Sequence, residues 1–294
     1  MTPSTPVSIC IPTYLTTEDR LGVLHETVKS ALDQEYSNFE VVVCDNASPI
    51  QADRIGITSP NLRIIREREH IPMTPNFNRA LRHANYDLLK PLCDDDLIHS
   101  EFLKRTVSHA KEYGIVITKI THDIKEIGKG SSRKPLVWRP GFSVDALKVA
   151  PVAPSATIFS RETFDSMKGY ANGQYHFDYD FAVRAAIAHK VTLVDKKLCY
   201  FRRWNESSST MNEDIYIHNL DLAKTLNWVF AENNPSLPFR WHAIAKTLVA
   251  SLALIKRPSR AFVPTIRDTY ISSSIALLLF ALRIRNHSSQ LQEF

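Results

Sequence analysis

Three consecutive carboxylates, Asp94, Asp95 and Asp96, follow directly on a short apolar segment at residues 88–93. Neighbouring anions repel one another, so such a cluster destabilises its own loop unless a positive charge lies close to it. Mg²⁺ and Mn²⁺ take oxygen ligands and bridge carboxylates to the phosphates of a substrate. The alternative is a solvated acidic turn that caps the helix expected near residue 99. We favour a cation site, because ligands of α/β proteins bind at the carboxyl ends of strands.

The order of apolar segments predicts how these carboxylates are positioned. Strand-like runs lie at residues 7–12, 39–44, 62–65, 88–93, 115–120, 155–159 and 191–201, and helical spacing at 21–32, 74–84, 102–113, 161–167 and 178–189. Continuous apolar strands that alternate with helices predict an α/β fold with a mostly parallel sheet covered by helices on both faces. Residues 127–135 read as a polar loop, and the pattern from residue 214 onward is wholly helical.

The composition narrows the ways in which the chain could hold a phosphate. The chain has 294 residues, a net charge of +5 and 8 glycines, and its sequence contains no glycine-rich phosphate loop. A bound nucleotide would therefore depend on a metal held by carboxylates. The net positive charge suits an anionic partner, and we expect no nucleic acid among the partners.

The cysteines and histidines favour neither disulfides nor a zinc site. The 11 histidines form no His-x-x-x-His cluster, and no Cys-x-x-Cys pair occurs among Cys10, Cys44, Cys93 and Cys199. We expect reduced core thiols in a cytoplasmic protein. The N-terminus lacks the pattern of a signal peptide, and the longest apolar run, residues 275–282, is shorter than the about 20 residues that span a bilayer.

Several motifs occur in a fixed order on these expected strands and helices. They are VSICIPTY at residues 7–14, SALDQ at 30–34, FEVVVCDNAS at 39–48, NFNRA at 76–80 and the acidic triplet at 94–96. In this order they resemble the family 2 inverting glycosyltransferases, closely over about the first hundred residues and more weakly to about residue 210. The resemblance implies a GT-A-type nucleotide-binding fold, a nucleotide-diphosphate sugar donor and a divalent cation, Mn²⁺ or Mg²⁺.

The resemblance also implies a division of the chain and a set of binding residues. A catalytic domain would cover residues 1–212, with a donor-binding half to about 121 and an acceptor half from about 122, followed by a helical extension at 213–294. The residues implied to contact the nucleotide or its diphosphate are Pro12, Thr13, Tyr14, Asp45, Asp94, Asp95, Arg202 and Arg203, and those implied at the metal are Asp94 and Asp96. For Asp45 the alternative is a turn cap with Asn46 and Ser48, because Asx residues favour such places.

The segment at residues 177–184 resembles the acceptor site of the family, in which a Glu-Asp pair precedes an arginine. Aligning Arg184 puts Asp178 in the place of the catalytic base, which takes the proton of the acceptor hydroxyl. The chain departs from the pattern at Phe177, where the glutamate of the pair is expected. The alternative is that Asp178 caps the following helix, and the two roles are compatible.

A basic pair, Arg202 and Arg203, follows the last expected strand. Relatives tend to carry a histidine two residues after the first arginine, near the metal or the diphosphate, and this chain has Trp204 there. Trp204 puts a third protein ligand of the metal, and strict metal dependence, in question. The arginines could instead neutralise the diphosphate directly, because the guanidinium fork suits phosphate. A solvated basic loop is the alternative.

The C-terminal segment, residues 251–294, carries six basic and two acidic residues, a net charge of +4 interleaved with apolar residues. A basic amphipathic helix can lie on an anionic membrane surface, and the alternative is a helical appendage packed on the catalytic domain. Peripheral contact with the cytoplasmic face of the inner membrane would suit a glycan or polyprenyl-linked acceptor. The resemblance implies such an acceptor in bacterial surface polysaccharide or lipopolysaccharide synthesis.

Two other functions compete with sugar transfer. Phe177 and Trp204 favour a binding protein that keeps the fold and has lost turnover. A nucleotidyltransferase that makes the sugar nucleotide is the second alternative, and it usually needs a glycine-rich loop with a lysine near the N-terminus. No such loop occurs in this sequence. We therefore keep the function that the resemblance implies, an enzyme that transfers a sugar with inversion.

Overall fold

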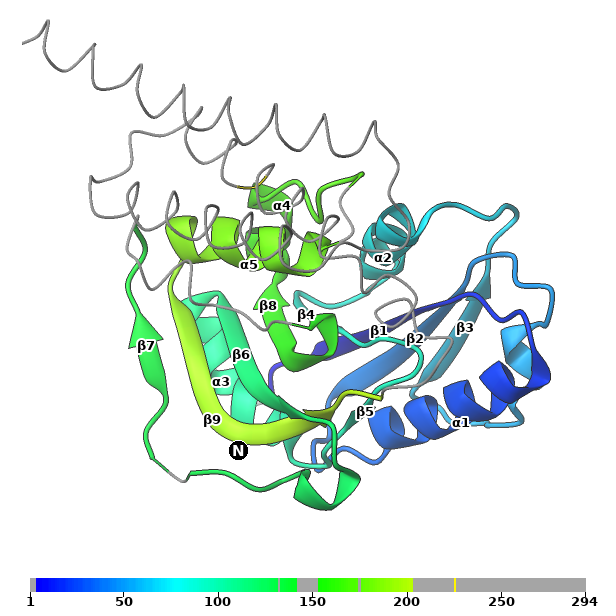
Figure 1. Ribbon diagram of the computed structural model, residues 1–294, viewed down its shortest axis with the longest axis horizontal. Coiled ribbons are helices and arrows are strands. Elements are labelled where there is room, and N and C mark those ends of the chain that lie inside the picture. Colours follow the sequence, from blue (N-terminus) through cyan, green and yellow to red (C-terminus); the bar gives the residue numbers. More distant parts are fainter. Residues whose placement is uncertain (1–3, 132, 142–152, 174–175, 203–224, 226–294) are drawn as a thin grey trace, which may run out of the picture.

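The computed structural model describes residues 4–131, 133–141, 153–173, 176–202 and 225. These residues form a single nine-stranded sheet with helices on both faces (Figure 1). The strands are β1 (Val7–Thr13), β2 (Phe39–Asp45), β3 (Leu62–Arg66), β4 (Leu88–Pro91), β5 (Leu97–Ile98), β6 (Ile115–Thr121), β7 (Leu136–Trp138), β8 (Thr157–Ser160) and β9 (Val191–Tyr200). The α-helices are α1 (Glu18–Leu32), α2 (Met73–Arg82), α3 (Phe102–Tyr113), α4 (Arg161–Ser166) and α5 (Phe177–Ala188).

The sheet is mixed, with the order β3-β2-β1-β4-β8-β6-β9-β5 and with β7 paired to β9. The first four strands of this order are parallel, and β6 is parallel to β9. Strand β8 runs antiparallel to both β4 and β6 and so joins the two parallel groups. The predicted mostly parallel α/β sheet is thus confirmed. The expected donor and acceptor halves share this one sheet, because Leu89 of β4 pairs with Phe159 of β8.

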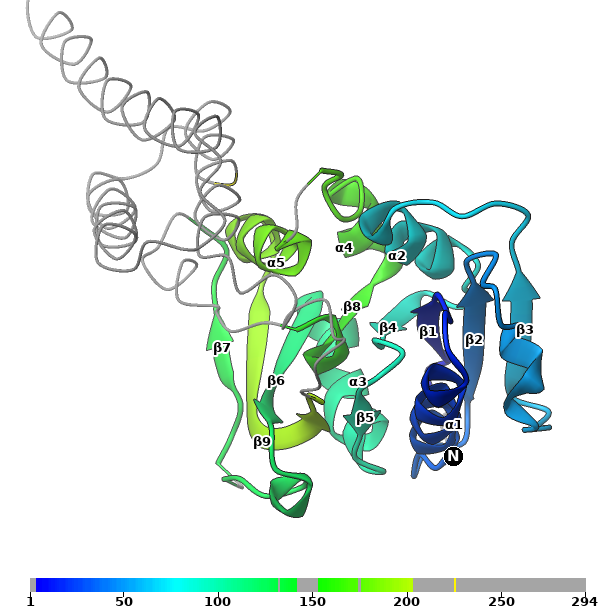
Figure 2. The same cartoon turned by 45° about the vertical axis from the view of Figure 1, so that its right-hand side comes forward.

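Two hydrophobic clusters fill the two faces of the sheet. Along β1 the side chains alternate, so that Cys10 joins the cluster under α2, α4 and α5 while Ile9 and Ile11 join the cluster over α1 and α3. Figure 2 shows α2, α4 and α5 on one side of the sheet and α1 on the other. The four cysteines are free thiols, and three of them are buried. Burial on both faces explains why these strands read as continuous apolar runs.

The strands β1 to β4 and the α-helices between them end within a few residues of their predicted bounds, whereas two short strands, β5 and β7, were not predicted. β5 has two residues, and β7 lies on the outside of β9, where Leu136 is 57% exposed. The polar loop before β7 is tied to β9 as well, because the Gly128 N–H donates to the carbonyl of Lys197 at 2.7 Å. Both short strands form by pairing with β9, which is distant in the sequence, so their own residues show no alternation of apolar and polar side chains.

The predicted helical extension at residues 213–294 lies outside the described residues, apart from Thr225. Among the helices that are described, none combines the length and the apolar character that crossing a bilayer requires.

Candidate functional site

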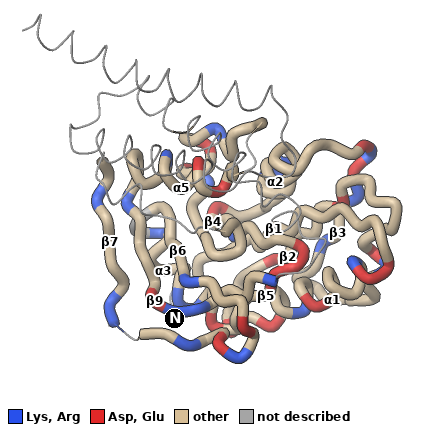
Figure 3. Tube along the Cα trace, in the orientation of Figure 1, with Lys and Arg blue, Asp and Glu red and all other residues tan. Residues whose placement is uncertain are grey.

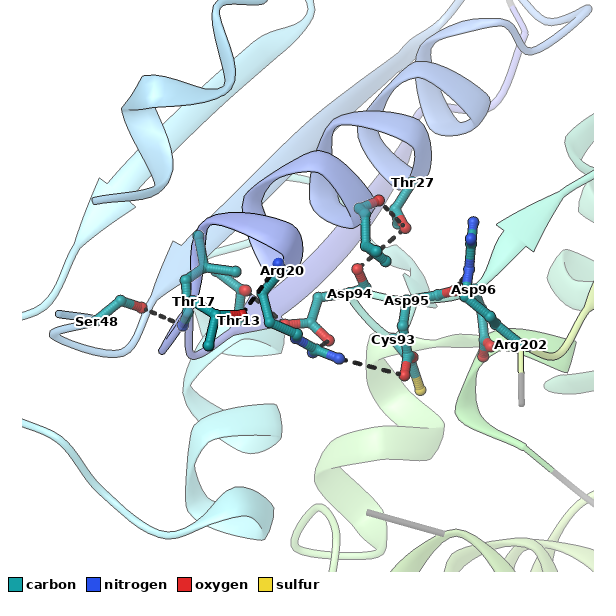
Figure 4. Close-up of polar contacts among 12 residues, drawn as sticks. Thr13, Thr17, Arg20, Thr27, Ser48, Cys93, Asp94, Asp95, Asp96 and Arg202 are labelled. Atoms are coloured by element: carbon teal, nitrogen blue, oxygen red, sulfur yellow. Dashed lines mark hydrogen bonds and ion pairs between the residues drawn. The ribbon is translucent and has the colours of Figure 1, made fainter. Parts of the chain in front are cut away.

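The acidic triplet lies in the turn between β4 and β5, at the carboxyl end of β4 (Figure 4). β4 runs parallel to β1, so this turn lies beside the end of β1. The Leu92 N–H donates to the carbonyl of Cys10 at 2.9 Å, which carries the pairing one residue beyond β4. The strand end that the sequence predicts is therefore present, and we call residues 93–96 the acidic turn.

The carboxylate of Asp94 is held by side chains from β1 and α1. It accepts hydrogen bonds from the Thr13 hydroxyl at 2.6 Å and from the Arg20 guanidinium at 2.6 Å. The backbone carbonyl of Asp94 accepts a further bond from the hydroxyl of Thr27 at 3.1 Å. Helix α1 thus fixes both the side chain and the main chain of this residue.

Asp96 faces the opposite way, into the protein, and is 1% exposed. Its carboxylate accepts hydrogen bonds from the Ser155 hydroxyl at 2.5 Å and from the Arg202 N–H at 3.1 Å. Burial raises the pKa of Asp96 to about 8, and the negative charge of Asp95 adds to the shift. A cation next to Asp96 would oppose this shift, because it favours the charged carboxylate.

A buried lysine lies beneath the turn. The Lys90 ammonium group donates to the carbonyls of Pro91 at 2.7 Å and Ser155 at 2.6 Å, and it sits 4.4 Å from the ring centre of Phe102. Burial lowers the pKa of Lys90 to about 8. Sequence reasoning missed this residue. The signal was a lysine inside an otherwise apolar strand, which is rarely buried unless paired.

The geometry of the turn fits a divalent cation. Cys93, Asp95 and Asp96 each offer a ligand atom, and these atoms lie within 4.8 Å of one another. Burial raises the pKa of the Cys93 thiol well above its usual value, so the carboxylate oxygens are the donors of choice for Mg²⁺ or Mn²⁺. The structure therefore brings possible ligand atoms of Asp95 and Asp96 close together. The sequence-based assignment of Asp94 and Asp96 to the metal stays a prediction.

A second group of possible ligands is formed by Cys44, Glu67 and His83. Here Glu67 already has cationic or hydrogen-bonding neighbours, His83 at 2.7 Å and Arg79 at 3.4 Å. Burial raises the pKa of the Cys44 thiol to about 12. We interpret this group as an ion cluster that fastens the end of α2 to the sheet.

The implied nucleotide residues occupy the ends of β1 and β2. Pro12 and Thr13 are buried, while Tyr14 is 38% exposed, with its ring centre 4.3 Å from that of His70. Sequence reasoning did not identify His70, which stands beyond β3 and outside every motif. Arg203 lies outside the described residues, as does Trp204.

Asp45 at the end of β2 is 1% exposed, and its carboxylate accepts hydrogen bonds from groups of the protein itself. It accepts from the backbone N–H groups of Ser48 at 2.8 Å and Ala52 at 3.2 Å, and from the Arg66 guanidinium at 2.6 Å. This is the turn-capping geometry that the sequence offered as the alternative. Contact between Asp45 and a nucleotide stays a prediction.

Arg202, which follows β9, forms hydrogen bonds with the acidic turn. Besides the bond from its N–H to Asp96, its guanidinium donates to the carbonyl of Asp95 at 3.0 Å and pairs with Glu26 of α1. Strands β5 and β9 are also paired here, through Leu97 and Tyr200. Arg202 therefore joins α1, the acidic turn and β9, a structural role that the sequence did not reveal.

The two carboxylates at the start of α5 differ sharply. Asp178 is partly buried in the first turn, where it accepts from the N–H of Tyr179 at 2.8 Å, and the N-cap residue of the helix is His176. Asp180 is 2% exposed and is paired with Arg184 at 2.7 Å. The sequence motif thus contains one structural carboxylate, Asp180, and leaves Asp178 as the candidate base.

Aromatic packing fixes where α5 begins. The Phe177 ring lies 5.0 Å from the ring of Phe77 in α2 and 4.9 Å from that of Tyr170, measured between ring centres. An apolar side chain therefore suits the place where the family pattern has a glutamate. Cys93 packs against the same cluster, so the acidic turn and the start of α5 share one face of the sheet.

Asn78 and a glycine secure the turn before α5. The Asn78 side chain donates to the carbonyl of Tyr170 at 2.9 Å and accepts from its N–H at 2.8 Å. Gly169 has φ +74°, and a Cβ atom there would lie 2.7 Å from the Asn78 side chain. Only glycine satisfies both the backbone conformation and the space. The NFNRA motif thus serves, through Asn78, to join α2 to the turn before α5.

Comparison with known sequences matches this arrangement to a family. The profile described as "Glycosyl transferase family 2" matches residues 8–167, more than half of the chain. The chain is 26% identical over 156 residues to "Putative glycosyltransferase EpsE" of Bacillus subtilis (strain 168), covering 50% of this chain and 55% of that protein. It is 22% identical over 251 residues to "Uncharacterized protein MT1568" of Mycobacterium tuberculosis (strain CDC 1551 / Oshkosh), covering 77% and 76%. The match to the first relative thus spans about half of its length.

Solved structures share the fold at low sequence identity. TarS of S. aureus in complex with UDP-GlcNAc superposes with a TM-score of 0.71 at 15% identity, over 94% of this chain and 81% of that chain. The mannosyltransferase PcManGT of Pyrobaculum calidifontis, in complex with GDP-Man and Mn²⁺, gives 0.59 at 16% identity, over 96% and 87%. These likenesses confirm the GT-A-type fold class that the resemblance implied.

Proposed function

Because the chain belongs to glycosyl transferase family 2, we propose that it is an inverting enzyme that moves a sugar from a nucleotide-diphosphate sugar to a glycan or lipid-linked acceptor. The observation that carries the proposal is the pair of carboxylates, Asp95 and Asp96, at the carboxyl end of a parallel strand. This is where α/β folds bind ligands, and carboxylates there can link a divalent cation to phosphates.

The acidic turn would hold the leaving group of the donor. Asp95 and Asp96 would hold Mn²⁺ or Mg²⁺, and such an ion would neutralise the charge that develops on the departing diphosphate. Asp94 is fixed by Thr13 and Arg20 and serves the ribose side of the nucleotide. Tyr14 at the end of β1, paired with His70, provides an exposed aromatic surface for the base.

Asp178 would take the proton of the acceptor. In an inverting transfer the acceptor oxygen forms the new bond to the anomeric carbon while the bond to the diphosphate breaks, and the hydroxyl proton passes to a carboxylate. Asp178 is preferred to Asp180, because the carboxylate of Asp180 is buried against Arg184 and the hydroxyl of Thr225. Both oxygens of Asp180 therefore already accept hydrogen bonds from side chains of the protein itself.

The donor can be identified by thermal stability in a panel of nucleotide sugars. UDP- and GDP-linked sugars come first, since TarS was solved with UDP-GlcNAc and PcManGT with GDP-Man. A ligand at 100 times its Kd should stabilise the fold by about 2.7 kcal/mol. Stabilisation that depends on Mn²⁺ or Mg²⁺ supports the proposal, and a flat response to every nucleotide sugar contradicts it.

Hydrolysis of the donor separates an enzyme from a binding protein. A binding protein that has lost turnover would be stabilised by the donor and would release no nucleoside diphosphate from it. The enzyme should release nucleoside diphosphate slowly even without an acceptor. Release by the wild-type chain that is absent from the Asp178→Asn variant would support catalysis at this site.

The charge of the C-terminal segment leads us to propose a lipid-linked acceptor in the membrane, as used in surface polysaccharide synthesis. Acidic and basic positions are interspersed along the described trace (Figure 3). Residues 251–294 carry a net charge of +4. Such a segment would bring the catalytic domain to an anionic membrane that presents a lipid-linked acceptor.

A further inference from the structure

Arg20 reaches from the first turn of α1 into the acidic turn (Figure 4). Its guanidinium lies 2.6 Å from a carboxylate oxygen of Asp94 and 3.7 Å from one of Asp95. The side chain is 13% exposed, so these contacts are shielded from solvent more than most surface ion pairs. One arginine therefore faces two of the three carboxylates at different distances.

The position of Arg20 in α1 does not serve the helix. A positive charge near the N-terminus opposes the helix dipole, which favours negative charge there. The negative residues of this turn are Glu18 and Asp19, and Thr17 caps the helix by accepting from the N–H of Arg20 at 3.4 Å. The favourable electrostatic partners of the Arg20 side chain are thus the carboxylates of the acidic turn.

We propose that Arg20 is a positioning residue of the donor site that competes with the divalent cation for Asp95 while it keeps Asp94 against Thr13. The inference rests on the proposed function. The close contact, to Asp94, persists when the cation binds, because that carboxylate is also held by the Thr13 hydroxyl. The longer contact, to Asp95, is the one that the cation replaces.

If Arg20 competes with the cation, removing Arg20 should increase the affinity of the acidic turn for the cation. Removing a residue that merely supports the turn would weaken cation binding. Removing a competing positive charge should strengthen it, because the cation no longer meets a guanidinium beside its ligand. The tightening should be at least about fivefold, the effect of one unit charge at about 4 Å in water, and larger where the turn is partly buried.

The test is a Mn²⁺ titration of the full chain without nucleotide, in which free Mn²⁺ is measured by electron paramagnetic resonance. Arg20→Gln should bind Mn²⁺ more tightly than wild type. The matched control is Arg54→Gln, since Arg54 pairs with Glu18 of the same helix but is 53% exposed. This control should leave the affinity unchanged. Unchanged or weaker binding by Arg20→Gln would overturn the proposal.

A second variant tests whether charge is the cause. Arg20→Lys keeps the charge and loses the guanidinium fork, so its Mn²⁺ affinity should lie nearer wild type than that of Arg20→Gln. Equal tightening in both variants would overturn competition by charge. If wild type binds too weakly to measure, a gain in Arg20→Gln supports the inference and no gain overturns it. Failure of the proposed function would appear elsewhere, as the absence of stabilisation by any nucleotide sugar.

Discussion

In the acidic turn after β4 the carboxylates are held by side chains from other elements, whereas at the start of α5 the buried carboxylate is held mainly within its own helix. Asp94 is bound by Arg20, 74 positions away in the sequence, and Asp96 by Ser155, 59 positions away. Asp180 is bound by Arg184, which follows it by four positions, and by the hydroxyl of Thr225, 45 positions away. Partners from outside make the shape of the turn depend on the whole fold, while α5 carries its own partner into place.

The comparison teaches where charge can be used for chemistry. In α5 Asp180 is buried in an ion pair with Arg184, whereas Asp178 is partly buried in the first turn and accepts from the N–H of Tyr179. In the acidic turn all three carboxylates lie close to cations or donors, so binding a metal requires an exchange of partners. Arg20 donates to Asp94 and the backbone N–H of Arg202 donates to Asp96, so both of these carboxylates already have partners.

The largest expected effect is at Asp96. Asp96→Ala should reduce sugar transfer to background and abolish Mn²⁺-dependent stabilisation by the donor, because the buried ligand of the turn is lost. Both are measured by steady-state transfer assays and thermal unfolding. Asp87→Ala is the matched control, since Asp87 precedes the same strand and its side chain is 95% exposed. Wild-type transfer by Asp96→Ala would leave the acidic turn as a structural feature only.

Asp178→Asn should lower the transfer rate by about 10²–10⁴-fold, the usual contribution of a positioned general base. The amide keeps the size of the side chain and can still accept the N–H of Tyr179, so donor affinity should stay near wild type. Steady-state kinetics and donor titration measure the two quantities separately. An equal loss in both would indicate damage to the helix start.

Asp180→Asn should act on stability where Asp178→Asn acts on rate. The substitution leaves the Arg184 guanidinium buried without its carboxylate, which typically costs about 3–5 kcal/mol. Chemical unfolding of both variants measures the difference, and the transfer rate per folded molecule should fall less for Asp180→Asn. A variant with wild-type stability and no transfer would exchange the roles of the two carboxylates.

Deleting residues 271–294 should have the smallest effect on either region. We expect weaker binding to vesicles of anionic lipid, because a basic residue near such a surface contributes about 1 kcal/mol, and little change in donor affinity. Vesicle co-sedimentation and donor titration measure the two, and neutral vesicles provide the control. If the full chain does not bind anionic vesicles, the segment has no membrane role.

The sequence determined the elements and the order in which they carry chemistry. Apolar runs that are buried on both faces predicted the parallel strands, and helical spacing predicted the helices between them. The acidic triplet stands at a strand end, as its position after residues 88–93 indicated. The Asp178 segment begins a helix, as its apolar spacing indicated. These features depend on neighbours in the chain, so the local pattern contains them.

Only the tertiary structure decided which partner each carboxylate has. That Arg20 turns toward Asp94, that Lys90 lies buried under Ser155, and that β8 enters the sheet antiparallel are consequences of segments meeting across the fold. Judged from the sequence alone, a charged side chain or a strand could pair with several other segments at similar energy. The choice among them comes from burial, which removes water as a competitor and leaves each group only the neighbours that packing provides.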